Sequence, residues 1–253
     1  MFDSIWQRSP IWSGPPQRPA LREDEVHLWL VPLQIAAIEI DALTQTLSSD
    51  ERMRATRFHF ARDQRRFIVA RGTLKRILGK YLGLAPQEVE FRYGPHGKPT
   101  VHTQAEDGAL RFNLSHAHEL ALVAVTNARE VGVDIEHSAR AVDANGIVER
   151  FFASHERSMY ESVAPGERQD LFLRYWTCKE AFAKATGQGL SLPLKQIEIL
   201  LTPTSPARLT PTVNGAPPGR RWTLQELRPN DEQFGALVVE GLGDFKIEFW
   251  QAP

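Results

Sequence analysis

Two carboxylates lie two residues apart in the sequence, which is the spacing of side chains on one face of a β-strand. Residues 131–136 alternate between apolar and polar types, so Asp134 and Glu136 should share one face of a strand. Side chains at positions i and i+2 lie about 7 Å apart and can converge on one cation. Mg²⁺ prefers oxygen ligands and typically takes one or two carboxylates together with substrate phosphates. The same acidic pair could also be the solvated face of an exposed strand.

A second pair of charged residues, Glu180 and Lys184, lies on a helix predicted over 168–186. Apolar residues occur on two sides of this helix: Leu171, Tyr175, Cys178 and Phe182 on one, Leu173 and Trp176 on the other. Because both sides should be buried, the charged pair is expected on a flank that is not simply solvent. The alternative is a surface ion pair at i,i+4, worth roughly 0.2–0.5 kcal/mol.

Ser115 and His116 place a hydroxyl beside an imidazole, just before a predicted strand. Neighbouring residues of an extended segment point in opposite directions, so they are a poor nucleophile and base pair. The sequence also lacks the G-x-S-x-G elbow of serine hydrolases. We expect both side chains to donate hydrogen bonds to an anion. The turn-rich segment 93–99 permits close approach of a ligand, but it is neither a P-loop nor a dinucleotide fingerprint.

The elements that must position these residues mix helices and strands in both halves of the chain, which indicates an α+β fold. Helices are predicted over 36–46, 63–82, 143–152 and 168–186; strands over 26–33, 88–92, 110–113, 119–126, 131–136, 195–201, 221–227, 235–240 and 245–250. On the helix over 63–82, Arg71 lies about 40° from Phe67 and borders the apolar stripe. It is either a snorkelling arginine or a guanidinium directed into a cleft.

Composition narrows the class of protein. The 253 residues suffice for one large domain or two smaller ones. A formal net charge of −1 argues against a strongly basic nucleic-acid binder. The single cysteine, Cys178, excludes an internal disulfide framework. There is no signal-peptide pattern, and no apolar run approaches the roughly 20 residues of a membrane helix. We therefore expect a cytoplasmic protein without nucleic-acid or membrane partners.

The near-zero net charge conceals two opposed charge distributions. Residues 52–80 contain ten Arg or Lys and one acid, for a net charge of +9, so the rest of the chain carries −10. A basic segment beside a carboxylate pair suits an anionic partner such as a polyphosphate or an acidic protein.

The order of four motifs resembles that of the 4′-phosphopantetheinyl transferases, and more closely their Sfp-type branch. The motifs are Gly97-Lys98-Pro99, Phe112-Asn113-Leu114-Ser115-His116, Gly132-Val133-Asp134-Ile135-Glu136 and the segment 176–184, which reads W-x-x-K-E-x-x-x-K. Residues 187–193 match that branch as well. The resemblance covers about residues 48–200, and the last two motifs at this separation are the specific ones.

The resemblance implies a pseudo-twofold pair of similar α/β subdomains with the active site at their interface. The expected organisation is a flexible N-terminal extension over 1–20, an N-terminal subdomain over 21–128 and a C-terminal subdomain over 129–253. A monomer is expected.

The activity implied is transfer of the 4′-phosphopantetheine arm of coenzyme A to a serine of an apo acyl or peptidyl carrier protein. The serine hydroxyl would attack the β-phosphate in a Mg²⁺-dependent step that releases adenosine 3′,5′-bisphosphate. By the resemblance, Asp134, Glu136 and Glu180 match the Mg²⁺ ligands, and Glu180 is also the general base, directly or through water. Lys184 and Lys179 would face phosphate or assist the leaving group.

The remaining matches concern coenzyme A. Ser115 and His116 match phosphate contacts, and Lys98 and Pro99 match a wall for the adenine and phosphate. One position departs from the family pattern, because an acid, Glu51, occupies a place where the family often has a lysine for the 3′-phosphate. Arg54 and Arg71 would then take over that role.

Two other functions remain open on the sequence. One is a binding module that recognises nucleotide or carrier without catalysis. The other is an unrelated metal-dependent phosphohydrolase, which would cleave phosphoesters without any carrier. The identity of the carrier protein is not encoded in any motif.

Overall fold

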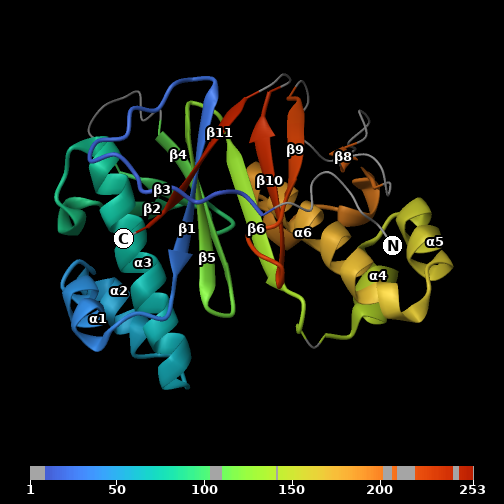
Figure 1. The fold of residues 1–253 in the computed structure, drawn as a ribbon, viewed down its shortest axis with the longest axis horizontal. Helices are drawn as coiled ribbons and strands as arrows, with labels where there is room; N and C mark the ends of the chain where they lie inside the picture. The colour runs from blue at the N-terminus through green and yellow to red at the C-terminus, as the bar shows by residue number, and fades with distance from the viewer. Residues whose placement is uncertain are drawn as a thin grey trace.

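Two β-sheets lie face to face between two layers of helices. The computed structural model describes residues 9–102, 110–140, 142–201, 207–209, 220–241 and 245–252. Figure 1 shows the first sheet backed by helix α3 on one outer side and the second sheet backed by α6 on the other. Apolar residues of both sheets fill the space between them, among them Leu28 and Leu122 from the first and Val133 and Leu237 from the second.

The first sheet has the strand order β11-β1-β5-β4. Its strands are β1 (Glu25–Pro32), β4 (Leu110–Ala117), β5 (Leu120–Asn127) and β11 (Lys246–Gln251); its helices are α1 (Ala37–Thr44), α2 (Ser49–Ala55) and α3 (Ala61–Leu82). Trp29 and Val123 of the sheet and Leu74 and Ile77 of α3 belong to one buried cluster. A small hairpin of β2 (Phe91–Tyr93) and β3 (Pro99–Val101) follows α3.

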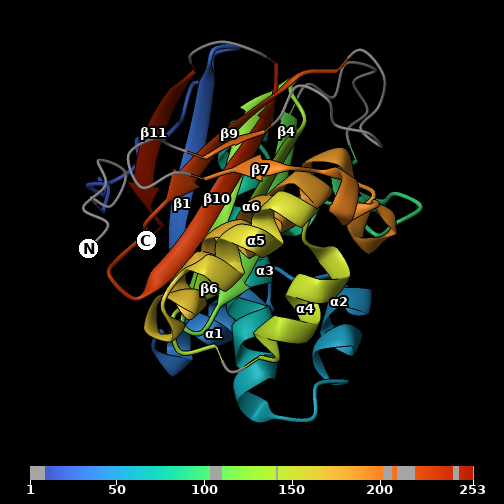
Figure 2. The same cartoon turned by 90° about the vertical axis from the view of Figure 1, so that its right-hand side faces the viewer.

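The second sheet has the order β6-β10-β9. Its strands are β6 (Val131–His137), β9 (Trp222–Leu227) and β10 (Gln233–Glu240); its helices are α4 (Ala144–Phe151), α5 (Ser154–Ser162) and α6 (Arg168–Thr186), and a short pair of β7 (Ile199–Leu200) and β8 (Arg208–Leu209) lies beside them. Figure 2 views this half from its helical side. No helix in the described ranges is long and apolar enough to cross a membrane.

The two halves repeat one topology. In each, a first strand leads through three helices, of which the last is the longest, to two antiparallel strands. The final strand inserts beside the first, which gives β1-β5-β4 in one half and β6-β10-β9 in the other. This repetition confirms the predicted α+β fold built from two similar subdomains.

The boundary predicted for the C-terminal subdomain is wrong at its end. Residues of β11 were placed in the second half, but β11 pairs with β1 in parallel and belongs to the first sheet. Trp250 lies 4.9 Å from Trp29, measured between ring centroids, and is buried in the core of the first half. The physical reason is that β1 would otherwise be the unpaired edge of the first sheet, and β11 covers that edge.

The prediction of a flexible extension over 1–20 is also corrected in part. Residues 1–8 lie outside the described ranges. Ser13 forms two backbone hydrogen bonds with β11, to Phe249 and from Gln251. Trp12 contacts the Phe249 ring edge-on at 5.4 Å and donates a hydrogen bond to the carbonyl of Pro229, in the turn between β9 and β10. These contacts fasten the segment to both halves.

Strand β6 and helix α6 approach one another closely at Gly132. A Cβ atom added there would lie 2.0 Å from the carbonyl oxygen of Ala181 and 2.3 Å from the backbone nitrogen of Ala185. Only glycine allows this approach. The two faces of β6 therefore make different contacts. Its apolar residues pack against the first sheet, and Gly132 on the other face allows close approach of the helix that carries Glu180 and Lys184.

We predict that Gly132→Ala destabilises the fold and disturbs the site together. The clash is with helix backbone, so α6 must move, and the free energy of unfolding should fall by about 3 kcal/mol. Denaturant unfolding measures this change. Gly166→Ala is the matched control, because nothing lies within 4 Å of its added Cβ. A stability loss for Gly132→Ala no larger than that of the control would refute the close-approach argument.

Candidate functional site

The candidate site is centred on Asp134, where three elements from both halves meet. Its Oδ1 atom accepts hydrogen bonds from Nζ of Lys184 at 2.6 Å and from Oγ of Ser115 at 2.8 Å. Ser115 comes from β4, Asp134 from β6 and Lys184 from α6. Strands β4 and β6 are held together at this point by Asn113, whose Oδ1 accepts from the backbone N–H of Val133 at 2.9 Å. The predicted residues Ser115, Asp134 and Lys184 are thus brought into direct contact.

The carboxylates of this cluster have the chemistry to hold a cation. Oδ2 of Asp134 is buried and has no hydrogen-bond partner among the described residues. Burial and the neighbouring charge of Asp134 raise the pKa of Glu180. A glutamate whose ionisation is opposed by burial and by a neighbouring aspartate, together with the unused Oδ2 of that aspartate, is a donor set that a divalent cation would stabilise.

Glu136 was predicted to be a Mg²⁺ ligand, but in the structure its carboxylate is already in an ion pair. It pairs with Arg140 four residues further on. No group of three or more His, Cys, Asp or Glu side chains stands gathered for a metal in the part of the chain that the structure describes. Oδ2 of Asp134 is therefore open to a cation, whereas Glu136 would have to exchange Arg140 for the ion.

A cavity of about 490 Å³ lies beside this cluster, on the side of the first half. Four of the predicted substrate-binding residues line it: Arg54, Arg71, Pro99 and His116. Aromatic and apolar residues complete the wall, among them Phe58, Phe67 and Tyr93. His116 connects the cavity with the cluster, because the charges of Lys184 and Asp134 both act on its imidazole. A cavity with arginines on one side and aromatic rings on another suits a nucleotide with phosphates.

Arg71 is fixed inside this wall. Its Nε lies 2.8 Å from Oε1 of Glu51, and its guanidinium stacks 4.1 Å from the centroid of the Phe91 ring. The Tyr93 hydroxyl accepts a hydrogen bond from it as well. Glu51 also pairs with Lys75, at 3.2 Å. Glu51 therefore pairs with two cations, and Arg71 is pre-oriented by it.

Sequence reasoning indicated a helix cap at 48–51 but missed the pairing of Glu51 with Arg71 and Lys75. Ser48 and Glu51 form a capping box at the start of α2: the backbone N–H of Glu51 donates to Oγ of Ser48, and that of Ser48 donates to the Glu51 carboxylate. The spacing S-x-x-E is the signature of this motif. Asn113 and Tyr93 had no such local signal, because their partners are distant in sequence.

Ser115 and His116 point in opposite directions, as predicted. Ser115 is buried against Asp134, while His116 lines the cavity. Burial and the positive charge of Lys184 lower the pKa of His116. The neutral form of this imidazole is therefore favoured near pH 7.

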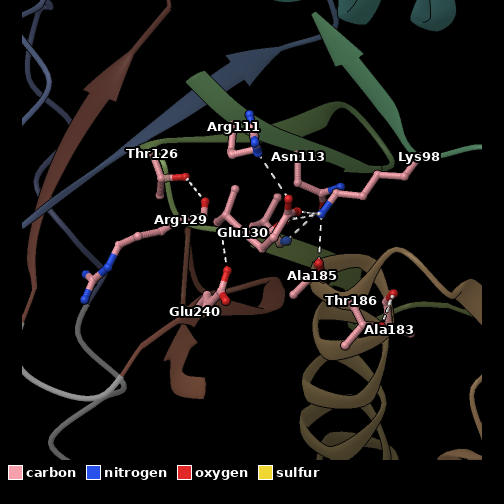
Figure 3. Close-up of polar contacts among 12 residues, drawn as sticks. Lys98, Arg111, Asn113, Thr126, Arg129, Glu130, Ala183, Ala185, Thr186 and Glu240 are labelled. Atoms are coloured by element: carbon pink, nitrogen blue, oxygen red, sulfur yellow. Dashed lines mark hydrogen bonds and ion pairs between the residues drawn. The ribbon is translucent and has the colours of Figure 1, made fainter. Parts of the chain in front are cut away.

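The expectation for Lys98 is corrected. Its ammonium lies at the joint between the halves: Nζ is 2.7 Å from Oε2 of Glu130 and 2.8 Å from the carbonyl oxygen of Ala185 (Figure 3). Burial lowers the pKa of Lys98, and Glu130 opposes that shift. Its neighbours Gly97 and Pro99 line the cavity. The Lys98 side chain points the other way because successive residues of an extended segment face opposite sides.

The expectation for Lys179 is wrong. Its side chain is 0% exposed and forms an ion pair of 2.8 Å with Glu156, which is also 0% exposed. The same ammonium donates hydrogen bonds to the carbonyls of Leu194 and Ile197. It therefore lies in the core of the second half and is not available to a phosphate. Adjacent residues of a helix are about 100° apart, so Glu180 reaches the site while Lys179 does not.

Comparison with known proteins now decides the family. A model described as the 4'-phosphopantetheinyl transferase superfamily matches residues 130–239, and a model of the N-terminal part of 4'-phosphopantetheinyl transferases matches 36–128. The 4'-phosphopantetheinyl transferase HetI of a Nostoc species is 43% identical over 239 residues, which cover 94% of this chain and 97% of that protein. The chain belongs to the 4′-phosphopantetheinyl transferase superfamily.

Two further matches are more distant. The chain is 27% identical to the 4'-phosphopantetheinyl transferase Sfp of Bacillus subtilis over 155 residues, which cover 61% of this chain and 66% of Sfp. A holo-(acyl-carrier-protein) synthase from Bacillus anthracis, solved in complex with CoA (3',5'-ADP), aligns with a TM-score of 0.36 and 20% identity; it covers 44% of this chain and 94% of its own. The predicted class of enzyme, a transferase of the phosphopantetheinyl group, is confirmed by the family assignment.

Proposed function

We propose that this phosphopantetheinyl transferase moves the 4′-phosphopantetheine arm of coenzyme A to a serine of an apo acyl or peptidyl carrier protein. The observation that carries the proposal is the contact of Asp134 with Lys184 and Ser115 at the edge of the arginine-lined cavity. A pure binding module has no need of this buried acidic cluster. The similarity to a 4'-phosphopantetheinyl transferase at 43% identity supports the transferred group.

In the proposed complex, coenzyme A occupies the cavity of about 490 Å³. Arg54 and Arg71 bind its phosphates, with Arg71 oriented by Glu51. His116 donates a hydrogen bond to a phosphate, and Pro99 contacts the adenine side. Guanidinium groups suit this task because they present several fixed N–H donors to phosphate oxygens.

The proposed reaction is an attack of the carrier serine on the β-phosphate. A bond forms between the serine oxygen and phosphorus, and the bond from phosphorus to adenosine 3′,5′-bisphosphate breaks. Mg²⁺, held by Asp134, Glu180 and Glu136, would supply neutralisation of the phosphate charge. Glu180 accepts the proton of the serine hydroxyl, directly or through water, and its raised pKa makes it a better base. Lys184 donates hydrogen bonds to the phosphate whose charge increases.

A transfer assay tests the proposal. The protein is incubated with coenzyme A, Mg²⁺ and a panel of apo carrier proteins, and the mass of each carrier is measured by mass spectrometry. A gain equal to the phosphopantetheine arm on the carrier serine is expected. Release of adenosine bisphosphate without any carrier would favour the phosphohydrolase instead, and coenzyme A binding that is independent of Mg²⁺, without transfer, would favour the binding module.

Because both similar halves lie in one chain, we also propose that a monomer suffices for activity. Light scattering measures the mass of the protein in solution and so tests this proposal.

His116 provides a test of the anion site. Because burial and Lys184 lower its pKa in the free protein, a bound phosphate should raise it and the complex should take up a proton. Affinity for coenzyme A should therefore increase as the pH falls from about 7 to 5, through the range in which the free imidazole is neutral and the bound one charged. Calorimetry in buffers of different ionisation enthalpy measures the uptake. His116→Gln should abolish it; an equal uptake in that variant would remove His116 from the anion site.

A further inference from the structure

Three consecutive residues connect the cavity with the catalytic helix. Gly97 and Pro99 line the cavity, and Lys98 between them sends its side chain to the opposite side. There its ammonium meets the carboxyl end of α6, at the carbonyl of Ala185, and the start of β6, at the carbonyl of Val131. A single side chain of the first half therefore reaches two elements of the second half.

The end of α6 is where a cation has most effect. The last carbonyls of a helix lack partners within it, and the helix dipole places partial negative charge there. Lys98 satisfies the Ala185 carbonyl at 2.8 Å. The stem of Lys98 also lies against Gly187, the left-handed residue that ends α6. Ala185 follows Lys184 directly and lies less than two turns beyond Glu180, so this contact fixes the end of the helix that carries both proposed catalytic side chains.

Glu130 anchors the ammonium from the other side. Its Oε2 lies 2.7 Å from Nζ of Lys98, and its Oε1 lies 3.1 Å from Nε of Arg111 on β4. The backbone N–H of Glu130 donates to Glu240 of β10 at 3.2 Å. Figure 3 shows how Lys98, Glu130 and the last turn of α6 converge. Glu130 is thus bonded to both sheets. If the Lys98 ammonium turned toward the cavity, the Glu130 carboxylate and the Ala185 carbonyl would each lose this donor.

We propose that Lys98 is a positioning residue, which fastens the cavity wall to the end of α6 and so sets Glu180 and Lys184 relative to the bound substrate. This inference rests on the proposed function, since it concerns the same site. It assigns no contact between the Lys98 ammonium and coenzyme A. Loss of the tie should therefore impair the chemical step more than it impairs binding.

The test is Lys98→Met, which keeps the stem and removes the charge. A small displacement of catalytic groups costs about 10- to 100-fold in kcat, whereas KM for coenzyme A should stay within about threefold. Lys195→Met is the matched control, because Lys195 is exposed and lies outside the site. A variant with unchanged kcat and a KM raised about tenfold or more would show direct contact with the substrate and overturn the proposal.

A second variant tests whether Lys98 acts through its pairing with Glu130. Glu130→Gln removes the anchor without touching the cavity lining, so kcat should fall in the same direction. The double variant should lose no more than Lys98→Met alone, because both changes break one tie. Losses that multiply would mean that the two residues act separately, and would overturn the proposal.

Hydrogen exchange separates this inference from the proposed function. Amides of residues 180–187 should exchange about tenfold faster in Lys98→Met than in the unmodified protein, while those of 70–78 in α3 keep their rates. Unchanged exchange at 180–187 would overturn the positioning role whatever the activity. Absence of transfer by the unmodified enzyme would instead reject the proposed function.

Discussion

Replacing Glu180 with glutamine should reduce kcat for phosphopantetheine transfer by about 100- to 10,000-fold, the range that one general base contributes. Glutamine preserves the size of the side chain but can neither accept the serine proton nor offer a charged ligand. The site's geometry makes the effect specific: Glu180 lies one turn before Lys184 on the same face of α6, close enough to Asp134 for their charges to interact. Binding of coenzyme A, measured by calorimetry, should remain, because Glu180 is not among the residues that line the cavity.

The two duties of Glu180 can be separated. If its main contribution is to hold Mg²⁺, a high concentration of the ion should restore much of the rate; if it is the base, the loss persists at saturating Mg²⁺. Glu149→Gln on α4 is the matched control, since that glutamate is exposed and lies outside the site. Turnover of Glu180→Gln equal to that of the control would remove Glu180 from the mechanism.

Lys179→Met should be the most destabilising of the changes considered, at about 3–5 kcal/mol. The substitution leaves the carboxylate of Glu156 buried without its cation, and it leaves the carbonyls of Leu194 and Ile197 without their donor. Burial of an unpaired charge is far costlier than loss of an exposed ion pair. Urea unfolding, with the m-value checked for constancy, gives the free energy.

The pH dependence and a double variant identify the cause of this loss. Burial raises the pKa of Glu156. Without Lys179, a proton can neutralise that acid, so the deficit should be smaller near pH 5 than near pH 8. The pair Lys179→Met with Glu156→Leu should be more stable than Lys179→Met alone, because no charge is then left buried. A variant that is as stable as the unmodified protein but has a raised KM for coenzyme A would restore the phosphate role that the structure denies to Lys179.

Much of the local structure could be predicted from the sequence because it depends on near neighbours. The helix predicted over 168–186 has those bounds in the structure, with Gly187 in the left-handed conformation at its end. Alternation in 131–136 placed Asp134 and Glu136 on one face, and opposite orientations were predicted for Ser115 and His116. Motif order also indicated the family before any comparison. These features follow from helical and strand periodicity, which the chain carries in its residue types.

The sequence by itself determined the family and the α+β class, and it indicated Asp134, Glu180 and Lys184 as candidates for the site. Only the tertiary structure decided which charged side chains face the cavity. Lys98 and Lys179 are both lysines, a residue type that can bind phosphate. In the structure, however, Lys98 binds the end of α6, and Lys179 binds a buried glutamate. Likewise, nothing in residues 246–251 states that they pair with β1. The physical reason is that a buried charge must be matched by a partner, and a strand edge by another strand, wherever the fold supplies them. Those partners lie far along the chain, beyond the reach of local pattern.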